Sequence, residues 1–154
     1  MLYFWAAMKG DFVNEPLEIP RFFRCVLAVA SLIVAGVLVT AATLEPSRKG
    51  MGTHEQLGLS PCYFPERLGV PCPACGMTTS WAHLMKGNVR ASAEVNLGGF
   101  ILCVSCLLCV PWFMLSAIKG RWILMRMTDG RILVFLVSWL LVTMADWLIR
   151  RLLI

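Results

Sequence analysis

The sequence predicts an all-α membrane protein with three transmembrane helices and short interfacial helices in the first loop. Of its 154 residues, 58% are hydrophobic and 15% are charged, whereas soluble domains average about 45–50% and about 25%. A soluble chain of this length cannot bury so much apolar surface. The hydrophobic residues also gather in three stretches, each close to the roughly 20 residues that a helix needs to cross a bilayer. Composition and clustering therefore both indicate a multi-pass membrane protein.

We expect the three transmembrane helices at residues 25–44, 97–118 and 132–149. At 1.5 Å per residue, about twenty helical residues span roughly 30 Å, the thickness of the hydrocarbon core. The first two stretches carry no charged residue, and the third carries only Asp146. This carboxylate lies in the last predicted turn, four residues before Arg150. We therefore expect it to reach the headgroups and to form an i,i+4 pair with that arginine.

The remaining segments follow from these spans. Residues 1–24 combine apolar residues, acids and prolines, which indicates an interfacial or flexible N-terminal segment. Residues 45–96 form a long loop, and residues 119–131 form a short basic loop. The 14 Lys and Arg residues divide equally between the two sides of the membrane. Because short loops carry more weight in the positive-inside rule, the basic loop favours a cytoplasmic N-terminus and a long loop outside.

The net charge of +5 does not indicate a nucleic-acid partner. The basic residues are spread between hydrophobic segments, without the basic patch that a nucleic-acid site needs. Anionic headgroups beside the helix ends account for them more simply. The expected partners are therefore the lipid bilayer and other membrane proteins.

The seven cysteines fall into two groups. Four lie inside apolar segments, where a thiol behaves as a small hydrophobic group that allows close helix packing: Cys25, Cys103, Cys106 and Cys109. Cys62, Cys72 and Cys75 lie in the polar long loop. Three thiols cannot all pair with one another in disulfides. The loop therefore holds the candidate functional thiols, and their redox state stays open.

The segment Cys72-Pro-Ala-Cys75-Gly76 can be interpreted as a metal knuckle. Two thiolates three residues apart can bind one ion, Pro73 stiffens the turn, and Gly76 lets backbone N–H groups face sulfur. Zinc is the ion that such a set would take, with Cys62 as the third ligand. The fourth ligand would then be His83, with His54 as the alternative.

The same segment can also be interpreted as the start of a helix. Cys72 would be the N-cap and Pro73 the first helical residue. A thiol at a helix N-terminus has a lowered pKa, so Cys72 and Cys75 would be the catalytic pair of a thiol–disulfide oxidoreductase. Two structural interpretations remain beside these: a disulfide from Cys62 that staples the loop, and buried thiols that pack at the membrane face.

Residues 76–86 have the pattern of a short amphipathic helix lying on the membrane surface. One apolar stripe consists of Met77, Trp81, Leu84 and Met85. Thr79, His83 and Lys86 fall on another side of the helix. Gly87 is then expected to end this helix, and Asn88 to cap a second short helix over residues 89–95. Asn96 leads into the second transmembrane span.

These residues resemble the bacterial membrane-protein family DUF2752. The resemblance covers about residues 60–110 and rests on Cys62, on the run from Leu68 to Thr78, and on the later residues Lys86, Gly87, Asn88 and Asn96. Two positions depart from the family pattern, since Thr79 stands where the family has Arg and Leu97 where it has Pro. The resemblance implies a bacterial cytoplasmic (inner) membrane location and a structural role for Pro73, Gly76, Thr78, Gly87, Asn88 and Asn96. It implies no reaction.

Taken together, the sequence favours a binding or accessory membrane component over an enzyme. Its site would consist of Cys62, Cys72 and Cys75, holding a metal or a loop-stapling disulfide. The alternative is a membrane thiol–disulfide oxidoreductase that uses Cys72 and Cys75.

Overall fold

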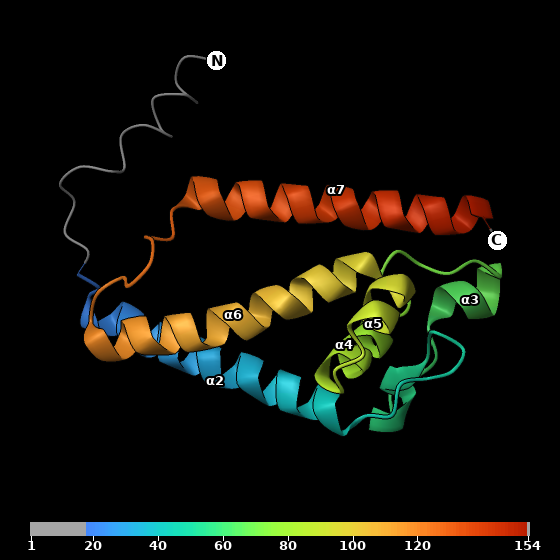
Figure 1. Ribbon diagram of the computed structural model, residues 1–154, viewed down its shortest axis with the longest axis horizontal. Helices are drawn as coiled ribbons and strands as arrows, with labels where there is room; N and C mark the ends of the chain where they lie inside the picture. The colour runs from blue at the N-terminus through green and yellow to red at the C-terminus, as the bar shows by residue number, and fades with distance from the viewer. Residues whose placement is uncertain (1–17, 154) are drawn as a thin grey trace, which may run out of the picture.

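The computed structural model describes residues 18–153, in which nearly all regular structure is helical (Figure 1). The predicted fold class is confirmed. Most of the predicted N-terminal segment, residues 1–17, lies outside the described residues. The elements in chain order are α2 (Arg21–Thr43), the 3-10 helix η2 (Thr53–Leu57), α3 (Tyr63–Leu68), α4 (Met77–Met85), α5 (Val89–Val95), α6 (Leu97–Lys119) and α7 (Asp129–Leu153).

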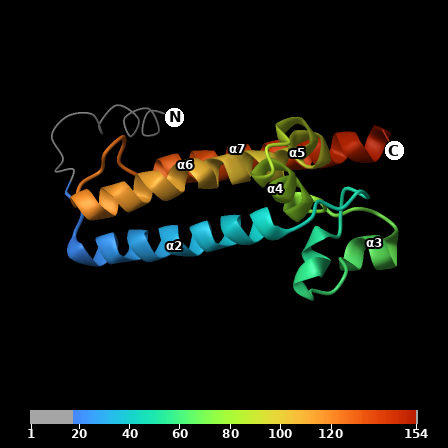
Figure 2. The same cartoon turned by 60° about the horizontal axis from the view of Figure 1, so that its bottom comes forward.

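Three of these helices, α2, α6 and α7, are long and apolar enough to cross a membrane. Helices α2 and α6 run side by side in opposite directions (Figures 1 and 2). The start of α2 is joined to the end of α6, because Ile19 N donates to Gly120 O at 2.8 Å. Arg24 Nε also donates to Ala117 O at 2.7 Å. Helix α2 thus begins at Arg21, before the predicted span, and Arg24 binds carbonyl groups at the C-terminal end of α6.

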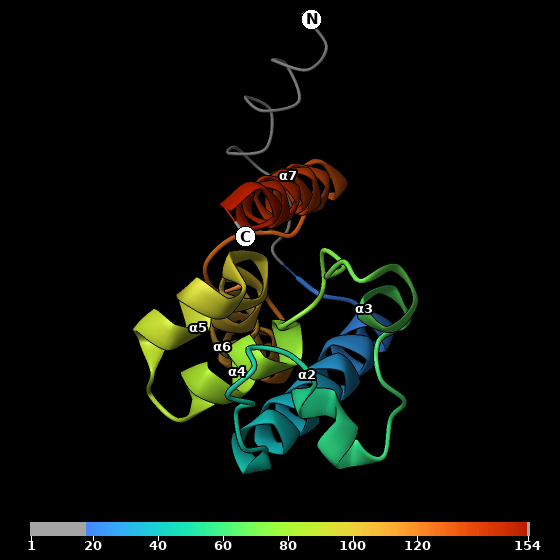
Figure 3. The ribbon, with the colours of Figure 1, turned by 90° about the vertical axis from the view of Figure 1, so that its right-hand side faces the viewer.

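Helix α7 lies on the opposite side of α6 from α2 (Figure 3). Helices α6 and α7 approach closely at Gly98, where a side chain would collide with Thr143. Trp139 Nε1 donates to Gly98 O at 2.8 Å at the same level. A small residue at a close helix contact is typical of packing inside membranes.

The predicted pair of Asp146 and Arg150 is present, at 3.0 Å between Oδ2 and Nη2. Each residue of the pair also has a partner that the sequence did not indicate. Asp146 Oδ2 also accepts from Leu97 N at 3.3 Å, and Arg150 Nη1 donates to Val95 O at 3.0 Å. The ion pair therefore joins the C-terminal half of α7 to the junction of α5 and α6.

Helices α4 and α5 pack as a hairpin against the N-terminal end of α6 and the C-terminal end of α2 (Figure 1). The amphipathic helix expected over residues 76–86 is present as α4, but the side that carries Thr79 is not exposed. Thr79, Ser80 and Ala82 are fully buried. Ser80 Oγ lies 2.9 Å from Ser92 Oγ, and Ser92 Oγ donates to Ser80 O at 2.7 Å. Small hydroxyl side chains that bond one another let the two helices approach closely, which favours burial over exposure.

Candidate metal centre

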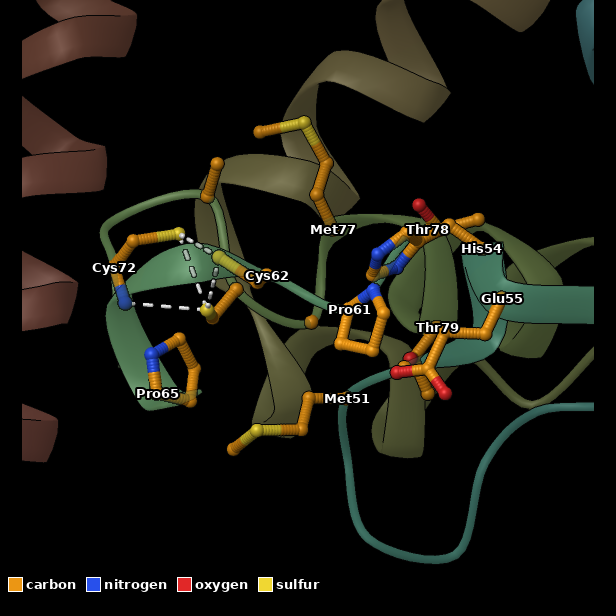
Figure 4. A pocket seen from close by; sticks show the side chains of 14 residues that line it. Met51, His54, Glu55, Pro61, Cys62, Pro65, Cys72, Met77, Thr78 and Thr79 are labelled. Carbon is orange, nitrogen blue, oxygen red and sulfur yellow. Dashed lines mark hydrogen bonds between the residues drawn. The ribbon is translucent and has the colours of Figure 1, made fainter. Parts of the chain in front are cut away.

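Three thiols from the long loop converge on one point (Figure 4). The Sγ–Sγ distances are 3.7 Å for Cys62–Cys72, 3.1 Å for Cys72–Cys75 and 3.8 Å for Cys75–Cys62. Cys75 is buried and the other two are half-buried. All three thiols are free, so no disulfide joins them. The structure therefore brings together the three cysteines that the sequence singled out, in an arrangement that could hold a metal ion.

The first of these thiols is placed by α3, a helix that the sequence analysis missed. Cys62 is its N-cap residue, and Gly69, with φ 65°, follows its last turn. Pro65 lies in the first turn, where the N–H that proline lacks has no helical acceptor in any case. The signal was present, as a proline at a helix start and a glycine at its end. A six-residue helix is too short to show a periodic apolar face.

The other two thiols are placed by a tight turn. Cys75 N donates to Cys72 O at 3.0 Å, and Met77 N donates to Ala74 O at 3.1 Å. Cys72 N faces the sulfur of Cys75 at 3.1 Å. These bonds close a turn over residues 72–76, and α4 begins only at Met77 with Gly76 as its N-cap. The expectation that Cys72 caps a helix is therefore wrong, and the thiol at a helix N-terminus is Cys62.

Gly76 is required at the end of this turn for two reasons. Its φ of 86° lies in the left-handed region, which costs any other L-residue about 1 kcal/mol or more. A Cβ atom there would also lie 2.7 Å from Gly50 O and 2.9 Å from Val95 Cγ1. The turn is thus pressed between the segment that follows α2 and the end of α5.

The side chain of Asn96 hydrogen-bonds the turn over residues 72–76. This residue is fully buried. Its Nδ2 donates to Cys75 O at 3.0 Å and to Pro73 O at 3.3 Å. Its Oδ1 accepts from Gly99 N at 2.6 Å and so caps α6. One amide therefore connects the cysteine turn to a membrane-spanning helix.

Further bonds hold the segments around the turn. Trp147 Nε1 on α7 donates to Pro71 O at 2.7 Å, directly before Cys72. Thr53 Oγ1 lies 2.8 Å from Thr79 Oγ1 and accepts from Ser47 N at 3.0 Å. The cysteine turn is thus fixed from α4, α6, α7 and η2, which gives its sulfur atoms a preorganised position.

Two of the thiols have pKa values shifted in opposite directions. The backbone N–H of Phe64 lowers the pKa of Cys62, with smaller contributions in the same direction from the Cys72 and Cys75 thiols, while burial acts against them. Burial raises the pKa of Cys75 to about 12, and its hydrogen bond with the Cys72 thiol adds to the effect. Without a metal ion, Cys75 is therefore protonated at neutral pH, and an ion bound there must displace that proton.

The two candidate histidines lie outside the sulfur group. Among the described residues, the group of ligand atoms within 4.8 Å of one another contains the three sulfurs and no histidine nitrogen. His54 lines the same cavity of about 490 Å³ as the cysteines. Its Nε2 lies 3.2 Å from Ser60 O, and Figure 4 shows it beside Thr78, across Pro61 from the thiols. His83 lies in the last turn of α4. A histidine as fourth ligand stays a prediction.

The remaining motif residues have local structural surroundings. Thr78 lines the cysteine cavity. Gly87, with φ 81°, follows α4 as predicted, and Asn88 N donates back to His83 O at 2.9 Å. Asn88 occupies the N-cap position of α5, but its side chain makes no capping bond.

The segment that carries these features, from Cys62 through the turn, α4 and α5 into α6, has a recognisable sequence pattern. Residues 62–110 match the family DUF2752, described as a protein of unknown function. The DUF2752 match confirms the resemblance found in the sequence and includes all three cysteines. No curated protein and no solved structure matches the chain. Thr79, which departs from the DUF2752 pattern, is fully buried and bonds Thr53, so this position serves packing here.

Proposed function

We propose that this chain is a binding or accessory membrane component whose Cys62, Cys72 and Cys75 hold one zinc ion at the end of the helix bundle. The observation that carries the proposal is the triangle of sulfur atoms. A tetrahedral zinc ion with Zn–S bonds of about 2.3 Å places neighbouring sulfurs about 3.8 Å apart. Two of the three distances, 3.7 and 3.8 Å, match this value, and the third, 3.1 Å, needs to open by about 0.7 Å.

The chemistry around the sulfurs supports zinc. Thiolates are soft ligands that favour zinc over oxygen-preferring cations such as Mg²⁺. Backbone N–H groups face two of the three sulfurs, from Phe64 toward Cys62 and from Cys72 toward Cys75. Such donors offset the negative charge that three thiolates bring together. The fourth ligand is His83 or, from the wall of the cysteine cavity, His54.

The zinc proposal is tested by metal analysis of the purified full chain. We expect one zinc per chain in the wild type and none in Cys75→Ser. The matched control is Cys25→Ser, because Cys25 is an exposed thiol on α2, remote in sequence and outside the sulfur group. This variant should keep its zinc. A wild-type protein that contains no metal, or in which Cys62 and Cys72 form a disulfide, overturns the proposal.

A thiol–disulfide oxidoreductase is the second candidate, favoured by the short Cys72–Cys75 distance of 3.1 Å. In that reaction one thiolate attacks a substrate disulfide and forms a mixed disulfide. The second thiol then attacks, so that Cys72 and Cys75 end as a disulfide and the substrate leaves as two thiols. Cys75→Ser should trap the mixed disulfide on Cys72 in a non-reducing gel. The absence of any trapped species argues against this activity.

We place the chain in the bacterial cytoplasmic membrane, with the N-terminus in the cytoplasm and the cysteine loop outside. The described geometry supports a common side for the loop and the C-terminus, since Trp147 and Arg150 contact Pro71 and Val95. Sidedness is read by labelling intact cells with a membrane-impermeant maleimide. An outside loop should label at Cys62 only after a chelator has removed the zinc. Labelling that requires cell lysis would place the loop in the reducing cytoplasm.

A further inference from the structure

An apolar groove of about 530 Å³ lies next to the cysteine cavity, between the second half of α2 and the start of α4. Five positions of α2 and the residue that follows its end line one wall: Ile33, Gly36, Val37, Thr40, Ala41 and Leu44. Met77, Thr78 and Trp81 of α4 line the other wall, and the segment around η2 completes the lining with His54, Leu57 and Leu59. The volume falls within the roughly 300–1,000 Å³ that is usual for small-molecule sites.

The groove and the cysteine cavity share three wall residues, His54, Met77 and Thr78. The two spaces therefore meet at this wall. Apolar groups dominate the α2 side, whereas the shared end carries the imidazole of His54 and the hydroxyl group of Thr78 beside the apolar side chain of Met77. This order of surfaces, apolar and then polar toward the thiols, fits a molecule with an apolar chain and a polar head.

The groove is open toward the bilayer. Its α2 wall belongs to a helix that is long and apolar enough to cross a membrane. Ile33 and Val37 expose 63% and 50% of their surface. An occupant thus enters from the lipid phase and does not have to leave water.

We propose that this groove binds the chain of a single long-chain amphiphile from the bilayer, with its polar head in the cysteine cavity. The position of the head beside the metal rests on the proposed zinc site, whereas binding of the chain does not. A head with an oxygen ligand can take the fourth position at the zinc ion in place of the histidine, since oxygen is an accepted zinc ligand. The site is then a lipid-facing one in which the metal binds the head of an amphiphile.

The test uses the full chain in nanodiscs of defined phospholipid, with two photoreactive long-chain fatty acids. One carries its diazirine near the methyl end, and the other near the carboxyl end. The methyl-end probe should label α2 between Ile33 and Leu44. The carboxyl-end probe should label the shared wall at His54, Met77 or Thr78. Labelled residues are identified by mass spectrometry of the digested protein.

Gly36→Leu is the decisive variant. A Cβ atom at Gly36 would meet nothing within 4 Å, and Gly36 lines the groove, so a leucine side chain there would take up part of the groove. The matched control is Gly130→Leu on α7, where a Cβ atom also meets nothing within 4 Å. We expect Gly36→Leu to reduce labelling by both probes several-fold and Gly130→Leu to leave it unchanged. Equal labelling of α2, α6 and α7 by both probes, or no difference between the two variants, overturns the inference.

Zinc is measured in the same samples, so that the two proposals fail separately. Gly36→Leu should keep its zinc while it loses the fatty acid. Cys75→Ser should lose its zinc and keep the labelling of α2 by the methyl-end probe. Patterned labelling of a wild-type protein without zinc supports the groove and overturns the metal centre. A full complement of zinc with unpatterned labelling supports the metal centre and overturns the groove.

Discussion

The Asn96 side-chain amide donates to the carbonyl oxygen of Cys75 at 3.0 Å while its own oxygen caps α6 through Gly99 N at 2.6 Å. The candidate metal turn and the first residues of a membrane-spanning helix are thus held by one buried side chain. The cysteine turn and the start of α6 therefore depend on the same hydrogen-bonding group.

Asn96→Ala should weaken both parts together. The substitution leaves the buried carbonyl groups of Pro73 and Cys75 and the N–H of Gly99 without their partner, at a cost of about 1–3 kcal/mol for such a group. Loss of a supporting bond around a metal site typically lowers metal affinity by about 10–100-fold. We expect a lower unfolding temperature and a weaker zinc affinity, measured by thermal denaturation in detergent and by chelator competition.

The control for this prediction is Asn88→Ala. Asn88 also occupies an N-cap position, but its side chain makes no capping bond. It should leave zinc affinity unchanged and lower stability only slightly. Equal effects of the two substitutions would show that the bonds of Asn96 to the turn do not support the metal site.

Gly76→Ala should disrupt the turn more than its backbone angle alone requires. Both Gly76 and Gly87 have positive φ values, 86° and 81°. A Cβ atom at Gly76 would lie 2.7 Å from Gly50 O, whereas one at Gly87 would meet nothing within 4 Å. Gly87→Ala therefore measures the cost of the angle, about 1 kcal/mol. The additional loss of stability in Gly76→Ala, by thermal denaturation, measures the clash. Matching losses would mean that the turn relaxes away from Gly50.

Much of the fold was predictable because membrane helices are specified locally. Long apolar stretches identified α2, α6 and α7, and the Gly87–Asn88 pair identified the boundary between α4 and α5. The ends were less accurate. Helix α2 includes Arg21 and Arg24 because Arg24 finds acceptors at the end of α6, a contact across 93 residues that no local pattern indicates.

The convergence of Cys62 with Cys72 and Cys75 was expected from their isolation in one polar loop, but its cause was not. Helix α3 was too short to be recognised, and one of the two interpretations of the Cys72 segment took its turn for a helix start. The decisive contacts are long-range. Asn96 lies 21 positions along the chain from its acceptor Cys75. Trp147 lies 76 positions from its acceptor Pro71, the residue before the turn. Such contacts depend on the packing of α6 and α7, which sequence periodicity does not specify.

Zinc affinity should rise with pH across the neutral range. Burial raises the pKa of Cys75 to about 12, so this thiol is protonated in the metal-free protein and must lose its proton to bind. Each proton displaced on binding strengthens the apparent affinity by about tenfold per pH unit. The lowered pKa of Cys62 makes its own proton easier to lose. As the pH rises, Cys62 therefore stops contributing to the pH dependence before Cys75 does. Competition with a chelator of known affinity between about pH 6 and 8 gives the slope. An affinity that does not change over this range contradicts thiolate coordination by Cys75.

Trp147→Phe should loosen the segment that leads into Cys72 while it keeps an apolar ring on α7. The lost bond is the one from Nε1 to Pro71 O at 2.7 Å, and a hydrogen bond of this kind contributes about 0.5–1.5 kcal/mol. The measurement is the rate at which a maleimide modifies Cys72 in chelator-treated protein, which should increase severalfold because the turn opens more often. Trp112→Phe is the matched control, since Trp112 Nε1 is buried without a hydrogen-bond partner within the described residues. This variant should react at the wild-type rate. Equal rates for Trp147→Phe and the wild type would mean that the bonds of Asn96 alone hold the turn closed.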